Sequence, residues 1–134
     1  MSYLFIVNPI AGKGKAKRTI PIIEEIMENS KHSYQIKITE KVGDGQLFAE
    51  DAKAEGFHTI VSVGGDGTLH EVVNGMAGGV QKLGIIPAGT GNDFARSLNI
   101  PFDIEDAMGV LVQGKAMSID LGRLDDKYFI NFCS

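Results

Sequence analysis

The chain has 134 residues, 43% of them hydrophobic, and a formal net charge of -4 at pH 7. This length and apolar fraction suit one globular domain that buries about two thirds of its unfolded surface around a single core. The acidic balance disfavours RNA and DNA as partners, because nucleic-acid-binding domains carry a basic face.

Cysteine usage and the lengths of the apolar runs indicate a cytoplasmic protein. The single cysteine, Cys133, permits no disulfide framework and no cysteine zinc cluster, and we interpret it as an inert buried thiol. No apolar run reaches the ~20 residues of a membrane span, and the N-terminus lacks the form of a signal peptide. We therefore expect a cytoplasmic location, with peripheral contact with a membrane surface left open.

Segments typical of strands and of helices alternate along the chain. Short β-branched and apolar runs predict strands at 4–7, 34–39, 59–63 and 83–86. Apolar residues at helical spacing predict helices at 20–27, 47–52, 69–75, 94–98 and 104–112. The tail then predicts two successive strands, 117–124 and 128–132, joined by a turn at Asp125 and Asp126.

This alternation predicts a three-layer α/β/α domain with a mainly parallel sheet, because right-handed crossovers place helices on both faces. The polar and apolar alternation of 34–39 indicates a strand near the edge of that sheet. Ligands of such sheets gather at the carboxyl ends of the strands. The segments after Val7, Ile38, Val63 and Ile86 are therefore expected to form one site.

A glycine-rich turn at 64–68, Gly-Gly-Asp-Gly-Thr, joins a predicted strand to a predicted helix. Its glycines let the backbone approach a ligand closely, and the N–H groups that open the helix carry partial positive charge. Such a turn suits phosphate, and Asp66 then requires a cation such as Mg²⁺ between carboxylate and anion. The alternative is ordinary turn chemistry, with Asp66 or Thr68 as the helix cap.

Two further loops have related chemistry. The segment 10–18 combines two glycines with four cationic side chains before a helix, a placement that opposes the helix macrodipole and points to a bound anion. It lacks the spacing of a Walker P-loop, and a solvated basic loop is the alternative. The segment 87–93, Pro-Ala-Gly-Thr-Gly-Asn-Asp, follows another strand, and Asn92 or Asp93 is expected to cap the short helix after it. Asp44 is a similar candidate cap for the helix that Gly56 ends.

Three ordered motifs resemble the signatures of the diacylglycerol kinase catalytic domain family. They are Asn-Pro-Ile-Ala-Gly at 8–12, the segment 64–75 that starts with Gly-Gly-Asp-Gly-Thr, and Pro-Ala-Gly-Thr-Gly-Asn-Asp-Phe-Ala-Arg at 87–96. The second motif alone would also suit NAD kinases and, more distantly, phosphofructokinases. The third is more specific and resembles lipid kinases that act on diacylglycerol, phosphatidylglycerol, sphingosine or ceramide.

The resemblance implies the N-terminal nucleotide-binding domain, of the fold shared with NAD kinase and phosphofructokinase, with ATP and Mg²⁺ as cofactors. The residues that it implies as ATP contacts are Asn8, Pro9, Ile10, Ala11, Gly12, Thr39, Gly64, Gly65, Asp66, Gly67, Thr68, Leu69, His70 and Thr90. Asp66 corresponds to the aspartate tied to Mg²⁺-ATP, with Asp93 and Asp120 as supporting acidic partners. Lys13, Lys15 and Arg96 are further candidates for neutralising phosphate. The alternative role for Asp93 is a helix cap, and the alternative for Asp120 is local pairing in a strand.

Members of this family continue into a second, mainly β domain that carries the catalytic base and a structural metal site. Since this chain ends at Ser134 within a predicted strand, we expect it to comprise the first domain alone and to lack a catalytic residue. The three histidines, His32, His58 and His70, are better explained as solvated or hydrogen-bonded structural residues. The fragment is therefore expected to bind Mg²⁺-ATP weakly and not to phosphorylate lipid.

The leading prediction is the nucleotide-binding domain of an ATP-dependent lipid kinase that converts diacylglycerol to phosphatidic acid at the inner membrane face. Phosphatidylglycerol and sphingosine are alternative substrates. An NAD kinase and a non-catalytic nucleotide-sensing module are the rival functions. A homodimer formed through the strand 34–39 or the tail strand is a further hypothesis.

Overall fold

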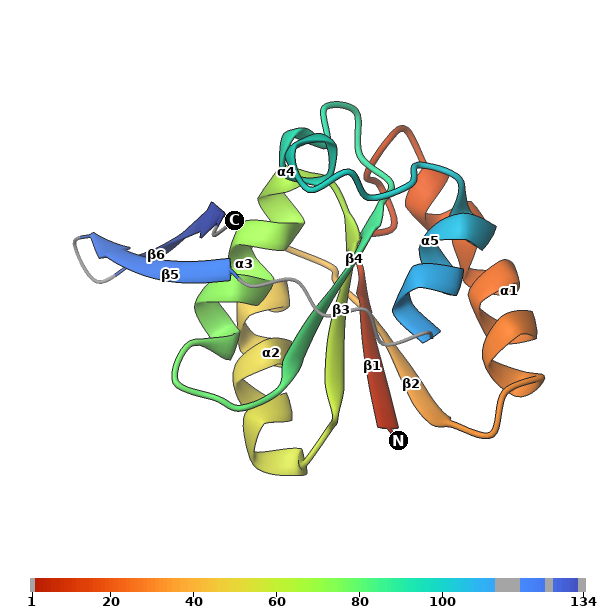
Figure 1. Ribbon diagram of the computed structural model, residues 1–134, viewed down its shortest axis with the longest axis horizontal. Coiled ribbons are helices and arrows are strands. Elements are labelled where there is room, and N and C mark those ends of the chain that lie inside the picture. The colour runs from red at the N-terminus through yellow and green to blue at the C-terminus, as the bar shows by residue number, and fades with distance from the viewer. Residues whose placement is uncertain (1, 113–118, 125–126, 133–134) are drawn as a thin grey trace.

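A parallel four-stranded sheet forms the centre of the computed structural model, which describes residues 2–112, 119–124 and 127–132 (Figure 1). The strands lie in the order β2-β1-β3-β4. Their bounds are β1 Ser2–Val7, β2 Ser33–Ile38, β3 Thr59–Gly64 and β4 Lys82–Pro87. All three strand pairs are parallel, so the four carboxyl ends lie along one edge of the sheet. The predicted strands and their shared edge are confirmed.

Helices cover both faces of the sheet, which confirms the three-layer α/β/α class (Figure 1). On one face lie α1 (Lys15–Glu28) and α5 (Ile104–Val112). The opposite face carries α2 (Asp44–Glu55) and α3 (Asp66–Met76). The short helix α4 (Asp93–Ser97) lies beyond the carboxyl ends of the strands.

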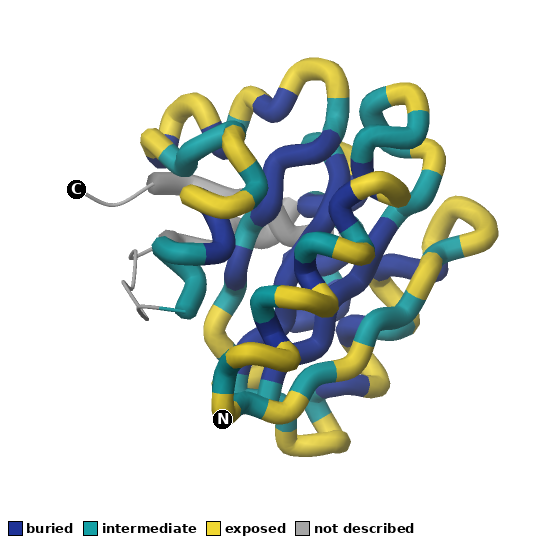
Figure 2. Tube along the Cα trace, turned by 90° about the vertical axis from the view of Figure 1, so that its right-hand side faces the viewer, coloured by how far each residue is buried: buried dark blue, intermediate teal, exposed yellow. Residues whose placement is uncertain are grey.

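Alternation along β1 explains how one strand serves both layers. Tyr3, Phe5 and Val7 pack toward α1 and α5, whereas Leu4 and Ile6 pack toward α2 and α3. Successive side chains of a strand point to opposite faces, so a continuous apolar run is buried on both sides. Figure 2 shows the resulting core in dark blue, enclosed by exposed loops.

The strand β2 lies at the edge of the sheet, as its sequence pattern predicted. Its residues are exposed or only partly buried, in contrast to those of β3, which are buried throughout. Only β1 pairs with β2 among the described strands.

Two glycines explain the close contact between α2 and α3. A Cβ atom built on Gly75 would lie 2.3 Å from the carbonyl oxygen of Gln46, and one built on Gly45 would lie 3.2 Å from the side chain of Glu71. Hydrogen in place of a side chain at these positions lets the two backbones approach each other.

Several helix starts differ from the sequence predictions. The helix expected from Ile20 begins five residues earlier, at Lys15, after the left-handed N-cap Gly14. Asp44 does not cap α2: the N-cap is Gly43, and the carboxylate of Asp44 accepts hydrogen bonds from the loop before the helix. A carboxylate in the first helical turn is favoured by the macrodipole even without a capping bond.

The tail forms an antiparallel hairpin of β5 (Ile119–Leu124) and β6 (Lys127–Phe132), which lies beside α3 and forms a sheet of its own (Figure 1). The two predicted strands are therefore confirmed. The predicted turn at Asp125 and Asp126 and the predicted thiol of Cys133 lie outside the described residues.

Candidate functional site

The loops at the carboxyl edge of the sheet are joined by backbone hydrogen bonds that continue the ladder beyond the strands. Thr39 N donates to Val7 O at 2.9 Å, and Asn8 N donates to Val63 O at 3.1 Å. Ala88 N donates to Gly64 O at 2.8 Å. The loops after all four strands are thus held side by side, as the sequence predicted.

Glycines allow these loops to touch backbone to backbone. A Cβ on Gly89 would lie 2.3 Å from Gly65 Cα, and a Cβ on Gly12 would lie 2.3 Å from Ala88 O. Gly12 also has a φ of 62°, which a larger residue adopts only with strain. Three of the predicted contact residues, Gly12, Gly64 and Gly65, therefore form a wall made of backbone.

The loop before α1 has an unusual left-handed conformation. Gly12, Lys13 and Gly14 have φ angles of 62°, 58° and 90°. A left-handed lysine costs about 1 to 2 kcal/mol relative to the ordinary conformation. Lys15 and Arg18 then lie in the first turns of α1, where their positive charge opposes the helix macrodipole. Strain and charge at one helix start favour a site for an anion.

Asp66 is the first residue of α3, but its carboxylate binds a different helix. Its Oδ2 accepts from Asp93 N at 3.0 Å and its Oδ1 from Phe94 N at 3.2 Å, the two N–H groups that open α4. The alternative interpretation of Asp66 as the cap of α3 is wrong, because the N-cap is Gly65 and receives no side-chain capping bond. Each carboxylate oxygen accepts one of these bonds and retains a second lone pair.

Asn92 occupies the N-cap position of α4, one of the two predicted positions, but its side chain makes no capping bond. Its side-chain oxygen accepts from Gly89 N and its side-chain nitrogen donates to Gly89 O, both at 2.9 Å. Asn92 therefore closes the loop after β4, and Asp66 supplies the capping oxygens. Asp93 is exposed at the first position of α4, directly beside Asp66.

Asp120 lies in the hairpin, where it pairs with Asn131, while Asp66 and Asp93 lie at the edge of the main sheet. The side chain of Asp120 lies outside the described part of the structure, and its role in an acidic network stays a prediction. Among the described residues, no group of three or more His, Cys, Asp or Glu side chains is arranged to hold a metal ion.

A shallow hollow of about 10 Å³, partly open to solvent, lies beneath the glycine loops. Its polar lining comes from Gly64, Gly65, Asp66 and Asn92, and its apolar lining includes Leu69 and Pro87. Pockets that enclose drug-sized ligands measure about 300 to 1,000 Å³. The hollow therefore has room for about one water-sized group, and a larger ligand would extend over the exposed loops.

Two predicted side chains make structural contacts instead of projecting freely. The Arg96 guanidinium lies over the Phe102 ring at 4.8 Å, and its Nε donates to Gly91 O at 3.0 Å. The His70 ring meets Phe94 edge to face at 4.9 Å. His70 is the fifth residue of α3, one residue beyond its first turn. Arg96 and His70 thus stabilise the loop 91–94.

The other residues that were predicted to contact ATP differ in how exposed they are. Ile10 and Thr90 are exposed in the loops after β1 and β4, and Gly67 is exposed at the start of α3. Thr68 and Leu69 are buried beneath the same turn. Asn8, Pro9, Ala11 and Thr39 are partly buried. The other two histidines are structural, as predicted: His32 contacts the Tyr3 ring, and His58 Nδ1 lies 2.7 Å from Thr59 Oγ1.

Sequence reasoning missed one polar contact of the motif helix. Glu71 Oε1 accepts hydrogen bonds from Gly43 N and Gly45 N at the start of α2. The sequence signal was the pair of glycines around Asp44, which leaves backbone N–H groups accessible to a carboxylate from another element.

Comparisons with known proteins agree with this geometry. The family model for the diacylglycerol kinase catalytic domain matches residues 2–124. Diacylglycerol kinases of Staphylococcus aureus strains bovine RF122 / ET3-1 and MRSA252 are 43% identical over 131 residues, covering 96% of this chain and 42% of theirs. The chain thus spans less than half the length of these curated relatives.

A crystal structure of a diacylglycerol kinase from Bacillus anthracis str. Sterne superposes with a TM-score of 0.84 at 29% identity, covering 96% of this chain and 45% of that one. None of the helices in the described ranges is long and apolar enough to cross a membrane. With the motifs, the sheet and these matches in agreement, the chain belongs to the diacylglycerol kinase catalytic domain family.

Proposed function

We propose that this chain is the nucleotide-binding domain of an ATP-dependent lipid kinase whose longer form transfers the γ-phosphate of ATP to the hydroxyl of diacylglycerol. The observation that carries the proposal is the convergence of three glycine loops around Asp66 at the carboxyl edge of the sheet. Phosphoryl transfer depends mainly on positioning and on neutralising the phosphate oxygens, which such loops can do.

The backbone supports phosphate binding at two places. Gly65 and Gly89 bring two loops into backbone contact that a Cβ on Gly89 would prevent, and the N–H groups that open α3 lie at the same edge. Lys13 and Lys15 add positive charge at the start of α1. The predicted ATP contacts from Asn8 to Gly12, at Thr39, from Gly64 to His70 and at Thr90 all belong to this edge.

The protein supplies only part of the coordination that a divalent cation needs at this site, and the phosphates of the nucleotide would supply more. Asp66 keeps one free lone pair on each oxygen after binding α4, and Asp93 is exposed beside it. Mg²⁺ is usually bound through one or two carboxylates together with substrate phosphates and water. We infer that Asp66, supported by Asp93, holds Mg²⁺ when ATP is present.

Diacylglycerol is the proposed acceptor. Phosphatidylglycerol and sphingosine are alternative lipids, and NAD is the alternative soluble acceptor. A non-catalytic nucleotide sensor is the rival from another class. We further propose that the chain by itself does not phosphorylate lipid, that the longer protein acts at the cytoplasmic membrane face, and that the β2 edge is a candidate dimer contact.

Calorimetric titration of the chain with ATP, with and without Mg²⁺, tests the nucleotide site. Asp66→Ala should abolish the Mg²⁺-dependent part of binding. Asp103→Ala is the matched control, since Asp103 accepts a hydrogen bond from Asp106 N in α5, and its loss changes the charge equally. Equal Mg²⁺-ATP affinity of wild type and Asp66→Ala would remove Asp66 from the site.

The lipid is tested with a form of the protein as long as its relatives, labelled ATP and three acceptors: diacylglycerol, sphingosine and NAD. Labelled phosphatidic acid is expected. Exclusive labelling of NAD would refute the lipid kinase proposal, and ATP binding with neither hydrolysis nor transfer to any acceptor would favour the sensor.

A further inference from the structure

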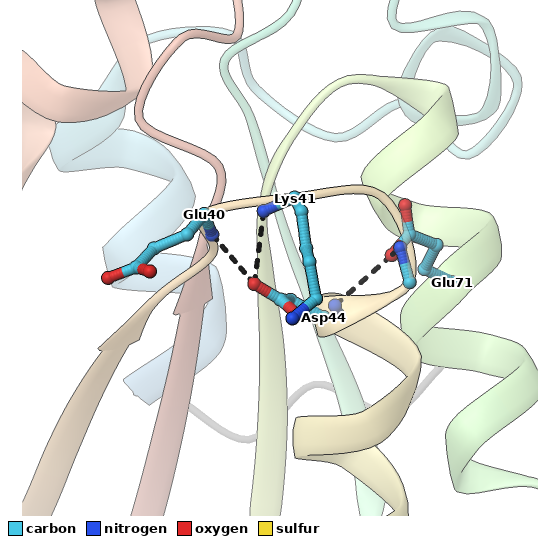
Figure 3. A network of polar contacts seen from close by, with 6 residues as sticks. Glu40, Lys41, Asp44 and Glu71 are labelled. Carbon is cyan, nitrogen blue, oxygen red and sulfur yellow. Dashed lines mark hydrogen bonds and ion pairs between the residues drawn. The ribbon is translucent and has the colours of Figure 1, made fainter.

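The carboxylate of Glu71 joins the motif helix to the neighbouring helix. Glu71 is on α3, and its Oε1 accepts from Gly43 N at 2.9 Å and from Gly45 N at 3.1 Å (Figure 3). Gly43 is the N-cap of α2, and Gly45 is the second residue of that helix. A carboxylate on another element thus satisfies N–H groups that a helix start leaves without an internal partner.

A second carboxylate holds the rest of the same loop. Asp44 Oδ2 accepts from Glu40 N at 2.8 Å and from Lys41 N at 3.0 Å (Figure 3). Glu71 and Asp44 together bind four backbone N–H groups between residues 40 and 45. The loop from β2 to α2 is consequently fixed from both sides.

The glycines around Asp44 make the Glu71 contact possible. Gly43 has a φ of 96°, a conformation that other residues adopt only with strain. A Cβ on Gly45 would lie 3.2 Å from both Cβ and Oε1 of Glu71, closer than an ordinary contact of about 3.5 to 4.0 Å. The two glycines of the Gly-Asp-Gly segment therefore leave room for the Glu71 side chain to reach the backbone of the loop.

The loop held by Glu71 includes Thr39, which forms one side of the proposed nucleotide site. It begins at Thr39, whose N–H bonds to Val7 O at the end of β1. The helix that carries Glu71 begins at Asp66, five residues or about 1.4 turns earlier on the same rigid element. Glu71 therefore fixes the position of the Thr39 loop relative to Asp66.

We propose that Glu71 is a positioning residue for nucleotide binding: it holds the loop 39–45 so that Thr39 and the Gly64–Thr68 turn face the same nucleotide. The inference rests on the proposed ATP site. Glu71 itself touches no nucleotide in this proposal and acts only through the two backbone N–H groups that it binds.

Four variants separate positioning from stability. Glu71→Ala removes the contact, and Glu71→Gln retains a side-chain oxygen that can accept both hydrogen bonds. Glu50→Ala removes an exposed carboxylate of α2 whose hydrogen bond is to Gln46 in the same helix, with the same change of charge. Ala52→Gly destabilises α2 through helix propensity, since Ala52 is buried away from the loop.

Two measurements on the 134-residue chain decide the question. Amide hydrogen exchange reports the opening of residues 40–45, and calorimetry reports Mg²⁺-ATP affinity at a temperature well below every melting point. For Glu71→Ala we expect faster exchange in this segment and affinity weakened about tenfold, equivalent to about 1.4 kcal/mol. Glu71→Gln should stay within about threefold of wild type, and both controls should bind as wild type does.

The inference is overturned if Glu71→Ala leaves the exchange of residues 40–45 unchanged. It is also overturned if Glu71→Ala binds Mg²⁺-ATP no more weakly than Ala52→Gly, because Glu71 would then act on stability alone. If Glu71→Gln bound Mg²⁺-ATP as weakly as Glu71→Ala, the effect would come from the charge of Glu71 and not from its hydrogen bonds, which would also overturn the inference. Wild type that binds no Mg²⁺-ATP would refute the proposed function first, and this inference with it.

Discussion

Replacing Gly75 by alanine tests whether close packing of α2 on α3 organises this domain. The added Cβ would lie 2.3 Å from Gln46 O and 2.6 Å from Ala49 Cβ. Ordinary contacts between such atoms are about 3.5 to 4.0 Å, so the two helices would have to separate by about 1 Å. Neither obstacle can rotate away, because one is a backbone oxygen and the other is a Cβ atom.

Two opposing effects set the size of the change. Overpacking of a close-packed interface costs about 1 to 3 kcal/mol, and the backbone contact places Gly75→Ala at the upper end of that range. Alanine is favoured over glycine within a helix by about 1 kcal/mol. We therefore expect a net loss of about 2 kcal/mol in the free energy of unfolding. At roughly 4 °C per kcal/mol for a chain of this size, the melting temperature should fall by about 8 °C.

Urea and thermal unfolding, followed by circular dichroism, measure this loss. Gly109→Ala is the matched control, because Gly109 lies within α5 and a Cβ there would meet nothing within 4 Å. It should gain up to about 1 kcal/mol. Gly75→Ala as stable as wild type, with the control stabilised, would refute the packing argument. Since Gly75 follows Glu71 by four residues, both face α2, and the separation should also lengthen the Glu71 contacts.

Two other predictions concern the loops. Backbone N–H groups, first that of Glu40 and then that of Lys41, lower the pKa of Asp44 below its usual 3.8. The unfolded chain therefore binds the proton more readily, so this stabilisation is complete above pH 3.8 and is lost as the pH falls through the folded pKa. Urea titrations above and below this pH should show that Asp44→Asn loses less free energy of unfolding on acidification than wild type does. An equal loss in both proteins would contradict the role given to the Asp44 carboxylate. Gly89→Ala should abolish Mg²⁺-ATP binding in calorimetry, because its Cβ would lie 2.3 Å from Gly65 Cα; retained affinity would show that the two loops need not touch.

The order and type of the main elements were predictable because each has a local signal. The apolar β-branched run of β3 and the alternation of β2 gave a buried strand and an edge strand, and Gly56 ended α2 as expected. The shared edge followed from parallel pairing, which the chain order of strands and helices favours. The start of α1 was less predictable, since its first turn carries lysines where acidic residues are usual.

The contacts of polar side chains could not be predicted from local sequence. Asp66, Asp44 and Asn92 each precede or open a helix and fit the pattern of a cap, yet none makes a capping bond to its own helix. Asp66 and Glu71 instead each bind backbone N–H groups up to 28 residues away, at the starts of other helices. Local patterns report which groups need partners, but not which distant segment supplies them.

The alternation of strands and helices, the glycine turns and the family resemblance could all be recognised from local sequence, because they depend on side-chain periodicity and on short motifs. The folded chain alone reveals that α3 holds its neighbours through two of its carboxylates: Asp66 binds the start of α4, and Glu71 binds the start of α2. A carboxylate binds whichever unpaired N–H groups the fold brings within about 3 Å, and that proximity arises only when the helices pack on the sheet.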